Sequence, residues 1–122
     1  KAMSLDSDIS KLDKKVQSRI VVERKIVRKT VKTFLEAGFT LGLDNDGDED
    51  HESIKWYEGE EIFKNLMDVD DEHLYVRHPD NQISSVYFVY GNDGYDVICD
   101  YGTSLEEWVG PIQDYAESLD TE

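Results

Sequence analysis

Hydrophobic residues recur at steps of three and four over residues 8–37, which is the spacing of one face of a helix. They are Ile9, Leu12, Val16, Ile20, Val27, Val31, Phe34 and Leu35. The start of this helix can be capped by Asp6, Ser7 or Asp8. Gly38 stands where a terminating glycine belongs. The first half is polar, so it can project from the body, fray or pair with another copy. Its Ile9, Leu12 and Val16, on a helix longer than a small core needs, predict a homodimer through this helix.

The rest of the chain alternates between short strand-like runs and two shorter helical runs. Strands are expected at residues 39–43, 53–57, 73–78, 84–91 and 96–101, and helices at 59–69 and from 103 onward. The order α-β-β-α-β-β-β-α predicts one α+β domain over residues 1–122, with an antiparallel sheet of about five strands covered on one face by helices. Residues 1–7 are expected to be disordered or, in part, left over from cloning.

The segment "YGNDGYDVICDYG" carries the clearest turn signal. Asn92-Asp93-Gly94 lies between two strand-like runs, which predicts a tight hairpin. The run from Val86 to Tyr90 is apolar on both faces and predicts a central strand. In the next strand, the alternation predicts two faces, one with Val97, Cys99 and Tyr101 and the other with Asp96, Ile98 and Asp100. Cys99 is therefore expected to be a buried, inert thiol.

The last helix is predicted from a doubled capping signal. Thr103 and Ser104 each have a glutamate three residues later, as in a capping box. The helix should place Leu105, Trp108 and Val109 inward. Pro111, after a glycine, is expected to kink or restart it, because proline removes a helical hydrogen bond.

Charge divides the chain into two parts. Residues 1–40 hold ten Lys and Arg against five Asp and Glu, a net +5, and residues 41–122 hold three against twenty-three, a net −20. The single cysteine excludes an internal disulfide. The longest apolar run is about five residues, far short of a membrane span. These features predict a folded, cytoplasmic protein with a basic helix and an acidic body.

The most acidic segment is "LDNDGDEDHE", residues 43–52. From Asp44, positions 1, 3 and 5 of a calcium-binding loop are acidic, but position 6 is Glu49 and position 12 is Lys55, where glycine and glutamate are required. No metal ligand is assigned there, and a solvated loop is favoured. A small-ligand or divalent-cation-binding domain that uses the acidic loop 44–52 stays open as an alternative function.

Catalytic patterns are weak throughout the chain. His73 and His78 are five residues apart on an expected strand, which places them on opposite faces, so surface histidines are favoured over a zinc site. No nucleophile elbow, Cys-His signature or phosphate-binding loop is present. We therefore expect no enzyme and no cofactor, with an unassigned hydrolase as the least favoured alternative.

The basic stripe of the first helix suggests contact with nucleic acid. It contains Arg19, Arg24, Lys25, Arg28, Lys29 and Lys32. The opposing charge of the acidic body makes direct nucleic-acid binding unfavourable. The stripe is better interpreted as the polar face of an amphipathic helix.

Carboxylates interleaved with aromatic residues in the acidic body favour binding of a basic protein, since charge steers the encounter and aromatic side chains supply affinity. One form of this function is nucleic-acid mimicry by an inhibitor from a phage or mobile element. The predicted partner-binding residues are Asp44, Asp46, Asp48, Glu49, Asp50, Tyr95, Asp96 and Asp100.

Two tracts also carry a family resemblance. "VERKIVRKTVKTFLEAGFTL" and "VYFVYGNDGYDVICDYGTSLEEWVGPI" resemble small acidic proteins of bacteria, phages and mobile elements, over roughly residues 20–118. In that group a long helix precedes a strand pair, and an aromatic hairpin leads into a terminal helix. The resemblance implies no agreed activity and supplies no catalytic residue.

Overall fold

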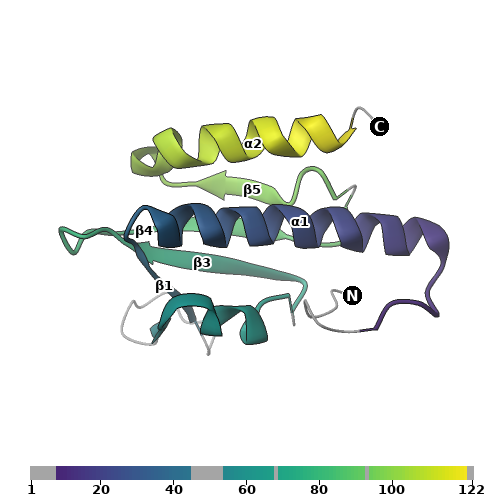
Figure 1. Ribbon diagram of the computed structural model, residues 1–122, viewed down its shortest axis with the longest axis horizontal. Helices are drawn as coiled ribbons and strands as arrows, with labels where there is room; N and C mark the ends of the chain where they lie inside the picture. Colours follow the sequence, from purple (N-terminus) through teal and green to yellow (C-terminus); the bar gives the residue numbers. More distant parts are fainter. Residues whose placement is uncertain (1–7, 45–53, 68, 93, 121–122) are drawn as a thin grey trace.

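The computed structural model confirms the predicted α+β fold (Figure 1). It describes residues 8–44, 54–67, 69–92 and 94–120. The sheet is antiparallel and five-stranded, in the order β2-β1-β3-β4-β5. The elements in chain order are α1 (Lys14–Glu36), β1 (Thr40–Asp44), β2 (Ile54–Tyr57), the 3-10 helix η2 (Gly59–Asn65), β3 (Asp71–Arg77), β4 (Ile83–Val89), β5 (Ile98–Tyr101), the 3-10 turn η3 (Thr103–Leu105) and α2 (Glu106–Asp120).

Helix α1 starts later than its hydrophobic pattern predicts. Its N-cap is Asp13, whose carboxylate accepts a hydrogen bond from the Lys15 N–H at 2.8 Å. Gln17 donates its side-chain amide to the Leu12 carbonyl, so the preceding residues form a turn. The cap predicted at residues 6–8 is therefore wrong, because a nearer aspartate serves the first turn.

The end of α1 is where glycine was predicted. Gly38 has φ +89°, its N–H donates to the Leu35 carbonyl, and the Phe39 N–H donates to the Phe34 carbonyl. This pair of bonds is a Schellman motif, which satisfies the last carbonyls of the helix and turns the chain into β1.

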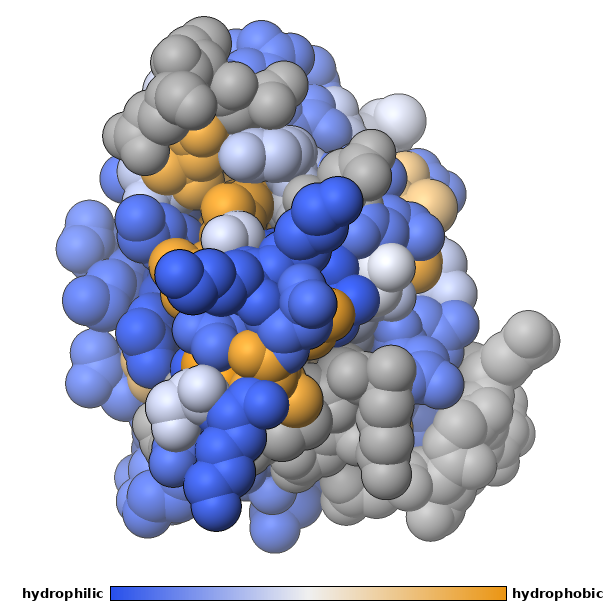
Figure 2. All heavy atoms as spheres, turned by 90° about the vertical axis from the view of Figure 1, so that its right-hand side faces the viewer, coloured by the Kyte–Doolittle hydropathy of each residue, from blue (hydrophilic) through white to orange (hydrophobic). Residues whose placement is uncertain are grey.

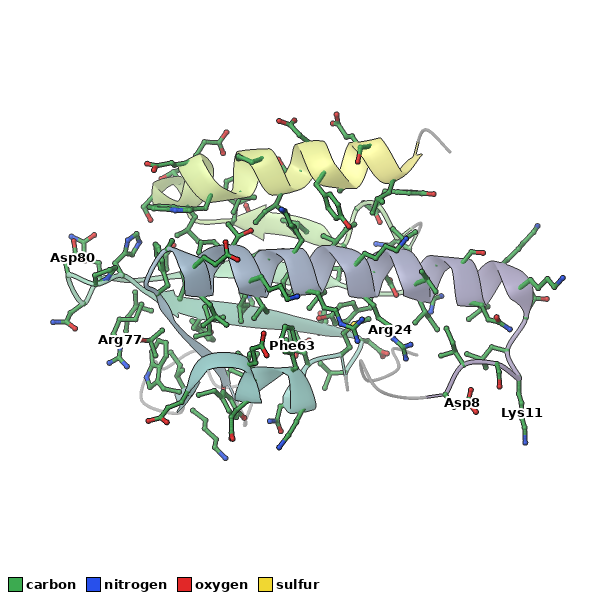
Figure 3. The ribbon with its side chains drawn as sticks, in the orientation of Figure 1. Asp8, Lys11, Arg24, Phe63, Arg77 and Asp80 are labelled. Atoms are coloured by element: carbon green, nitrogen blue, oxygen red, sulfur yellow. The ribbon has the colours of Figure 1, made fainter. Side chains whose placement is uncertain are left out.

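The helices of the described residues pack on one face of the sheet (Figure 1), and the core lies between the two layers. The sheet contributes Leu41, Leu74, Val86 and Phe88 to this core, each fully buried. From η2, the side chain of Phe63 packs against the same cluster (Figure 3). As predicted, β4 is an interior strand.

The connection between β4 and β5 is wider than the predicted tight hairpin. Asp93 lies outside the described residues, but β4 ends at Val89 and β5 begins only at Ile98. The Val89 N–H donates to the Val97 carbonyl and closes the loop. Gly94 has φ +96° and lies against α1, where a Cβ would be 3.1 Å from the Arg19 carbonyl oxygen.

A β-bulge overturns the prediction for Cys99. Phe88 pairs with Ile98 and Tyr87 pairs with Asp100, so Cys99 is an additional residue on β5. The alternation breaks at this point, and Cys99 is exposed rather than buried. Ile98, predicted on the opposite face, is buried with Phe88.

Two predictions for the shorter helices need correction. The segment at 59–69 forms a 3-10 helix that ends at Asn65, and Met67 has φ +67°. The second begins with η3 after Gly102, and Glu106 accepts a hydrogen bond from the Tyr101 hydroxyl instead of completing a capping box. Helix α2 then continues through Pro111 as one element, with Leu105 and Val109 buried as predicted.

Candidate functional site

The face of the sheet opposite the helices is the first candidate surface. Strand pairing places three rows of outward residues across it. They are Ile54, Asp44, His73, Tyr87 and Asp100 in one row, Trp56, Gly42, Tyr75 and Ser85 in the next, and Thr40, Arg77 and Ile83 in the third. We call this set, together with Asp71 and Val89 two residues further along β3 and β4, the open face.

Aromatic rings run across the open face from β2 to β4. The His73 ring lies 4.5 Å from the Tyr87 ring and 5.9 Å from the Tyr75 ring, and both pairs are stacked. At the β2 edge, the Arg77 guanidinium sits 4.4 Å from the centre of the Trp56 ring, a cation–π contact. Arg77 extends away from α1 and α2 in Figure 3. His73, Tyr75 and Tyr87 thus form one stacked group, and Trp56 with Arg77 forms a second aromatic contact at the β2 edge. We call these four rings the aromatic platform.

Gly42 explains how Trp56 reaches this platform. A Cβ at Gly42 would lie 2.8 Å from Cε3 of Trp56 and 2.7 Å from Cγ2 of Ile54. Real Cβ atoms are not found that close to a neighbour, so only glycine lets the two β2 side chains lie over β1.

Carboxylates flank the rings. Asp71 accepts a hydrogen bond from the Tyr87 hydroxyl at 2.5 Å, which raises the pKa of Tyr87 because the bond favours the neutral phenol. Leu43 pairs with Leu74, so Asp44 lies beside His73, in the row that ends at Asp100. Three interstrand spacings separate these two aspartates by about 14 Å.

A small cavity of about 240 Å³ opens at the β5 side of this face. Its walls include His73, Ser85, Tyr87 and Asp100. Tyr101 also lines it and donates its hydroxyl to Glu106, a bond that raises the pKa of Tyr101. The cavity thus combines aromatic walls with one carboxylate, a setting that suits a cationic side chain.

Tyr95 and Asp96 lie on the other side of the sheet from Asp100. Asp96 precedes β5 and, with Tyr95, lines a cavity of about 250 Å³ against Gln113 and Glu117 of α2. The prediction that Asp96 and Asp100 share one strand face is therefore wrong, because the bulge at Cys99 and the late start of β5 break the alternation.

Buried polar contacts fix the β4–β5 loop to α1. Glu23, only 1% exposed, accepts a hydrogen bond from the Gly91 N–H at 2.7 Å and lies 3.6 Å from Nε of Arg19. Burial raises the pKa of Glu23, and the Gly91 and Arg19 contacts oppose that shift.

A second carboxylate binds the same end of the loop, one residue earlier. Glu72 accepts hydrogen bonds from the Tyr90 hydroxyl and from the Met67 N–H. Burial, followed by the neighbouring Glu72, raises the pKa of Tyr90 well above its usual value. Both carboxylates hold backbone in place.

The other predicted site residues fall outside the described ranges. These are Asp46, Asp48, Glu49 and Asp50, with most of the acidic loop 44–52. Within the described ranges, no group of three or more His, Cys, Asp or Glu side chains is arranged to hold a metal ion.

The histidines differ from each other. His73 is exposed on the open face, as a surface histidine should be. His78 is partly buried, 4.6 Å from the Phe39 ring and 5.9 Å from Trp108, so it extends the core rather than the surface.

Sequence reasoning did not identify Trp56, His73, Tyr75 and Tyr87 as site residues. The alternation in "HLYVRH" and "SSVYFVY" contains part of the signal, since three of its outward positions are His73, Tyr75 and Tyr87. Strand order was needed to show that these positions adjoin one another.

No family model, curated protein or solved structure matches this chain. The family resemblance and the homodimer therefore remain predictions. Among the described residues, no helix has the length and apolar character needed to cross a membrane.

Proposed function

We propose that this protein is a non-enzymatic acidic binding module that engages a basic protein partner through its open face. The observation that carries the proposal is the aromatic platform of His73, Tyr87 and Trp56, flanked by Asp71 and Asp100, on a sheet face that no described helix covers.

The chemistry of the open face suits arginine and lysine side chains. Guanidinium groups stack on aromatic rings, as Arg77 does on Trp56, and pair with carboxylates. The cavity beside Asp100 and Tyr87 is large enough for one such side chain. Aromatic residues of this kind are enriched among the side chains that dominate binding energy at interfaces.

The charge of the chain supports the same partner. The net −20 of residues 41–122 favours rapid encounter with a positively charged surface, and this attraction is screened over about 8 Å at physiological salt. A basic surface that normally holds nucleic acid is one such target. In that case the protein acts by mimicry and competes with nucleic acid for the groove.

The test is affinity capture with the full chain as bait, from lysates at rising salt, followed by competition with duplex DNA. The open-face variant carries Asp44→Asn, Asp71→Asn and Asp100→Asn. We expect it to recover at least about tenfold less of the wild-type partner at physiological salt, since each charged contact contributes roughly 1 kcal/mol.

The matched control carries Glu107→Gln, Asp114→Asn and Glu117→Gln, three exposed carboxylates of α2. It removes the same charge from the other layer of the protein and should retain the partner. Equal loss of partner recovery in both variants would show that binding depends only on total charge and not on the open face. No loss of recovery in either variant would refute the proposal. If DNA fails to displace a captured partner, the mimicry form is wrong.

A further inference from the structure

A basic groove lies beside the first turns of α1, on the helix side of the sheet and away from the open face. It is a cavity of about 500 Å³ whose wall includes Lys14, Lys15, Arg19, Asn92 and Tyr95. Figure 2 faces this end of the molecule, and hydrophobic spheres lie there between strongly hydrophilic ones. The volume is in the range of small-molecule sites.

A second cavity of about 500 Å³ continues the groove towards α2. It shares Lys14, Ser18, Val22 and Tyr95 with the first and adds Lys25 and Leu119. Tyr95 therefore stands between two halves of one groove, with apolar side chains beside it and cationic groups around it. This combination is suited to an anion that also carries a planar, partly apolar group.

The local charge is opposite to that of the whole chain. The described residues that line the two cavities include four cationic side chains and no carboxylate, although the chain carries −15. The carboxylates of Asp13 and Glu23, which lie close to the groove lysines and Arg19 along the chain, have other roles. Asp13 caps α1 through the Lys15 N–H, and Glu23 is buried against Gly91.

Arg19 is held in place within this groove. Its side chain is 19% exposed and lies 3.6 Å from Glu23, one helical turn away. Gly94 packs on the Arg19 carbonyl and on Val22, which fixes the loop that carries Asn92 and Tyr95 against the helix. Because Arg19 and this loop are already restrained, these two parts of the groove lose less entropy when a ligand binds, whereas Lys14 and Lys15 are exposed.

We propose that this groove binds a nucleoside polyphosphate, with the phosphates on Lys14, Lys15 and Arg19 and the base against Tyr95. Lysine and arginine are the usual phosphate ligands, and aromatic rings stack on bases. Asn92 can pair with the edge of a base, because its amide both donates and accepts hydrogen bonds.

A small ligand fits better than a polymer. Charges farther away than about 8 Å are largely screened at physiological salt, so a small anion in the groove is influenced mainly by the four cations. A long nucleic acid or an acidic peptide would extend beyond the groove over exposed carboxylates such as Glu117 and Asp114. Repulsion there opposes both polymers.

The test is titration calorimetry on the full chain with adenosine triphosphate, inorganic tripolyphosphate and adenosine. We expect saturable binding of the nucleotide, one molecule per chain, and weaker binding of the other two probes. Lys14→Gln with Lys15→Gln should weaken nucleotide binding about tenfold, through the loss of two charge-assisted contacts. Tyr95→Leu should weaken binding of the nucleotide but not of tripolyphosphate.

The matched control is Lys32→Gln with Lys64→Gln, two exposed lysines that lie outside the groove. It removes the same charge and should bind the nucleotide like the wild type. The proposal is overturned if the heats do not saturate, if the control loses as much affinity as the groove variant, or if tripolyphosphate binds as tightly as the nucleotide. Because the groove and the open face share no residue, this result and that of the capture experiment are independent.

Discussion

The two faces of the sheet are built from alternate residues of the same strands, yet they differ in what they do. Leu74 and Val86 on the helix-covered face are fully buried, whereas their neighbours His73 and Tyr87 on the open face remain accessible. The covered face provides most of the apolar burial that stabilises the fold. The open face carries stacked rings with carboxylates beside them, and these groups do not belong to the hydrophobic core. Substitutions there should therefore affect the proposed binding more than stability.

The largest effect should come from the covered face. Leu74→Ala removes a fully buried side chain and should lower the free energy of unfolding by about 2–5 kcal/mol. Tyr87→Ala, one strand away on the open face, should cost about 1 kcal/mol, since it loses one hydrogen bond and one stacked ring pair. Denaturant unfolding of both variants measures the contrast, and equal losses would show that the open face is part of the core.

The contact of Trp56 and Ile54 with Gly42 is one place where the open face is packed as tightly as a core. Substitution of Gly42 tests this contact. Gly42→Ala places a Cβ 2.8 Å from a Lys55 carbonyl oxygen and from the Trp56 ring. This overpacking should lower the free energy of unfolding by about 1–3 kcal/mol. To make room, Trp56 should move away from Arg77. Chemical unfolding gives the stability, and tryptophan fluorescence reports the ring. A variant with wild-type stability and emission would contradict the packing over Gly42.

Gly94 tests the contact between the β4–β5 loop and α1. Gly94→Val forces a β-branched residue to φ +96° and places its Cβ 3.2 Å from that of Val22. The conformational cost alone is about 1–2 kcal/mol. The melting temperature should fall, while capture through the open face, measured below that temperature, should persist. Gly91→Val is the matched comparison, because Gly91 has the same φ of +96° but no atom within 4 Å of the position of its Cβ. The difference in melting temperature between the two variants measures the contact of Gly94 with α1.

The buried Glu23 gives the loop contact a pH dependence. Its folded pKa is raised above the usual 4.5, so the stability it contributes is complete below that value and is lost as the pH rises through the folded pKa. Subtracting the free energy of unfolding of Glu23→Gln from that of the wild type isolates this effect. The difference should fall with rising pH, and a difference that rises would assign Glu23 a lowered pKa.

The smallest effect should be at Cys99, where we expect reactivity without a change in fold. Because the bulge exposes the thiol, an alkylating reagent should label it in the native protein at a rate close to that in the unfolded chain. Circular dichroism after labelling should be unchanged. Protection in the native state would instead place Cys99 in the core, as the alternating pattern alone predicts.

Features that depend on near neighbours could be predicted from the pattern of amino acids alone. The three-and-four spacing identified α1, Gly38 marked its end, and the apolar run at 86–90 marked an interior strand. Helical spacing and the glycine that ends a helix involve residues within a few positions of each other, so local pattern is sufficient for both.

Which side chains meet across the sheet could not be predicted in this way, because it depends on strand order and register. The bulge that exposes Cys99 depends on the register between β4 and β5, and a shift of one residue moves every later side chain to the other face. For the same reason Asp96 and Tyr95 face the helices while Asp100 joins the open face. The rows that bring Trp56, His73 and Tyr87 together require three strand pairings, one of them between the non-consecutive strands β1 and β3, and no local pattern contains that information.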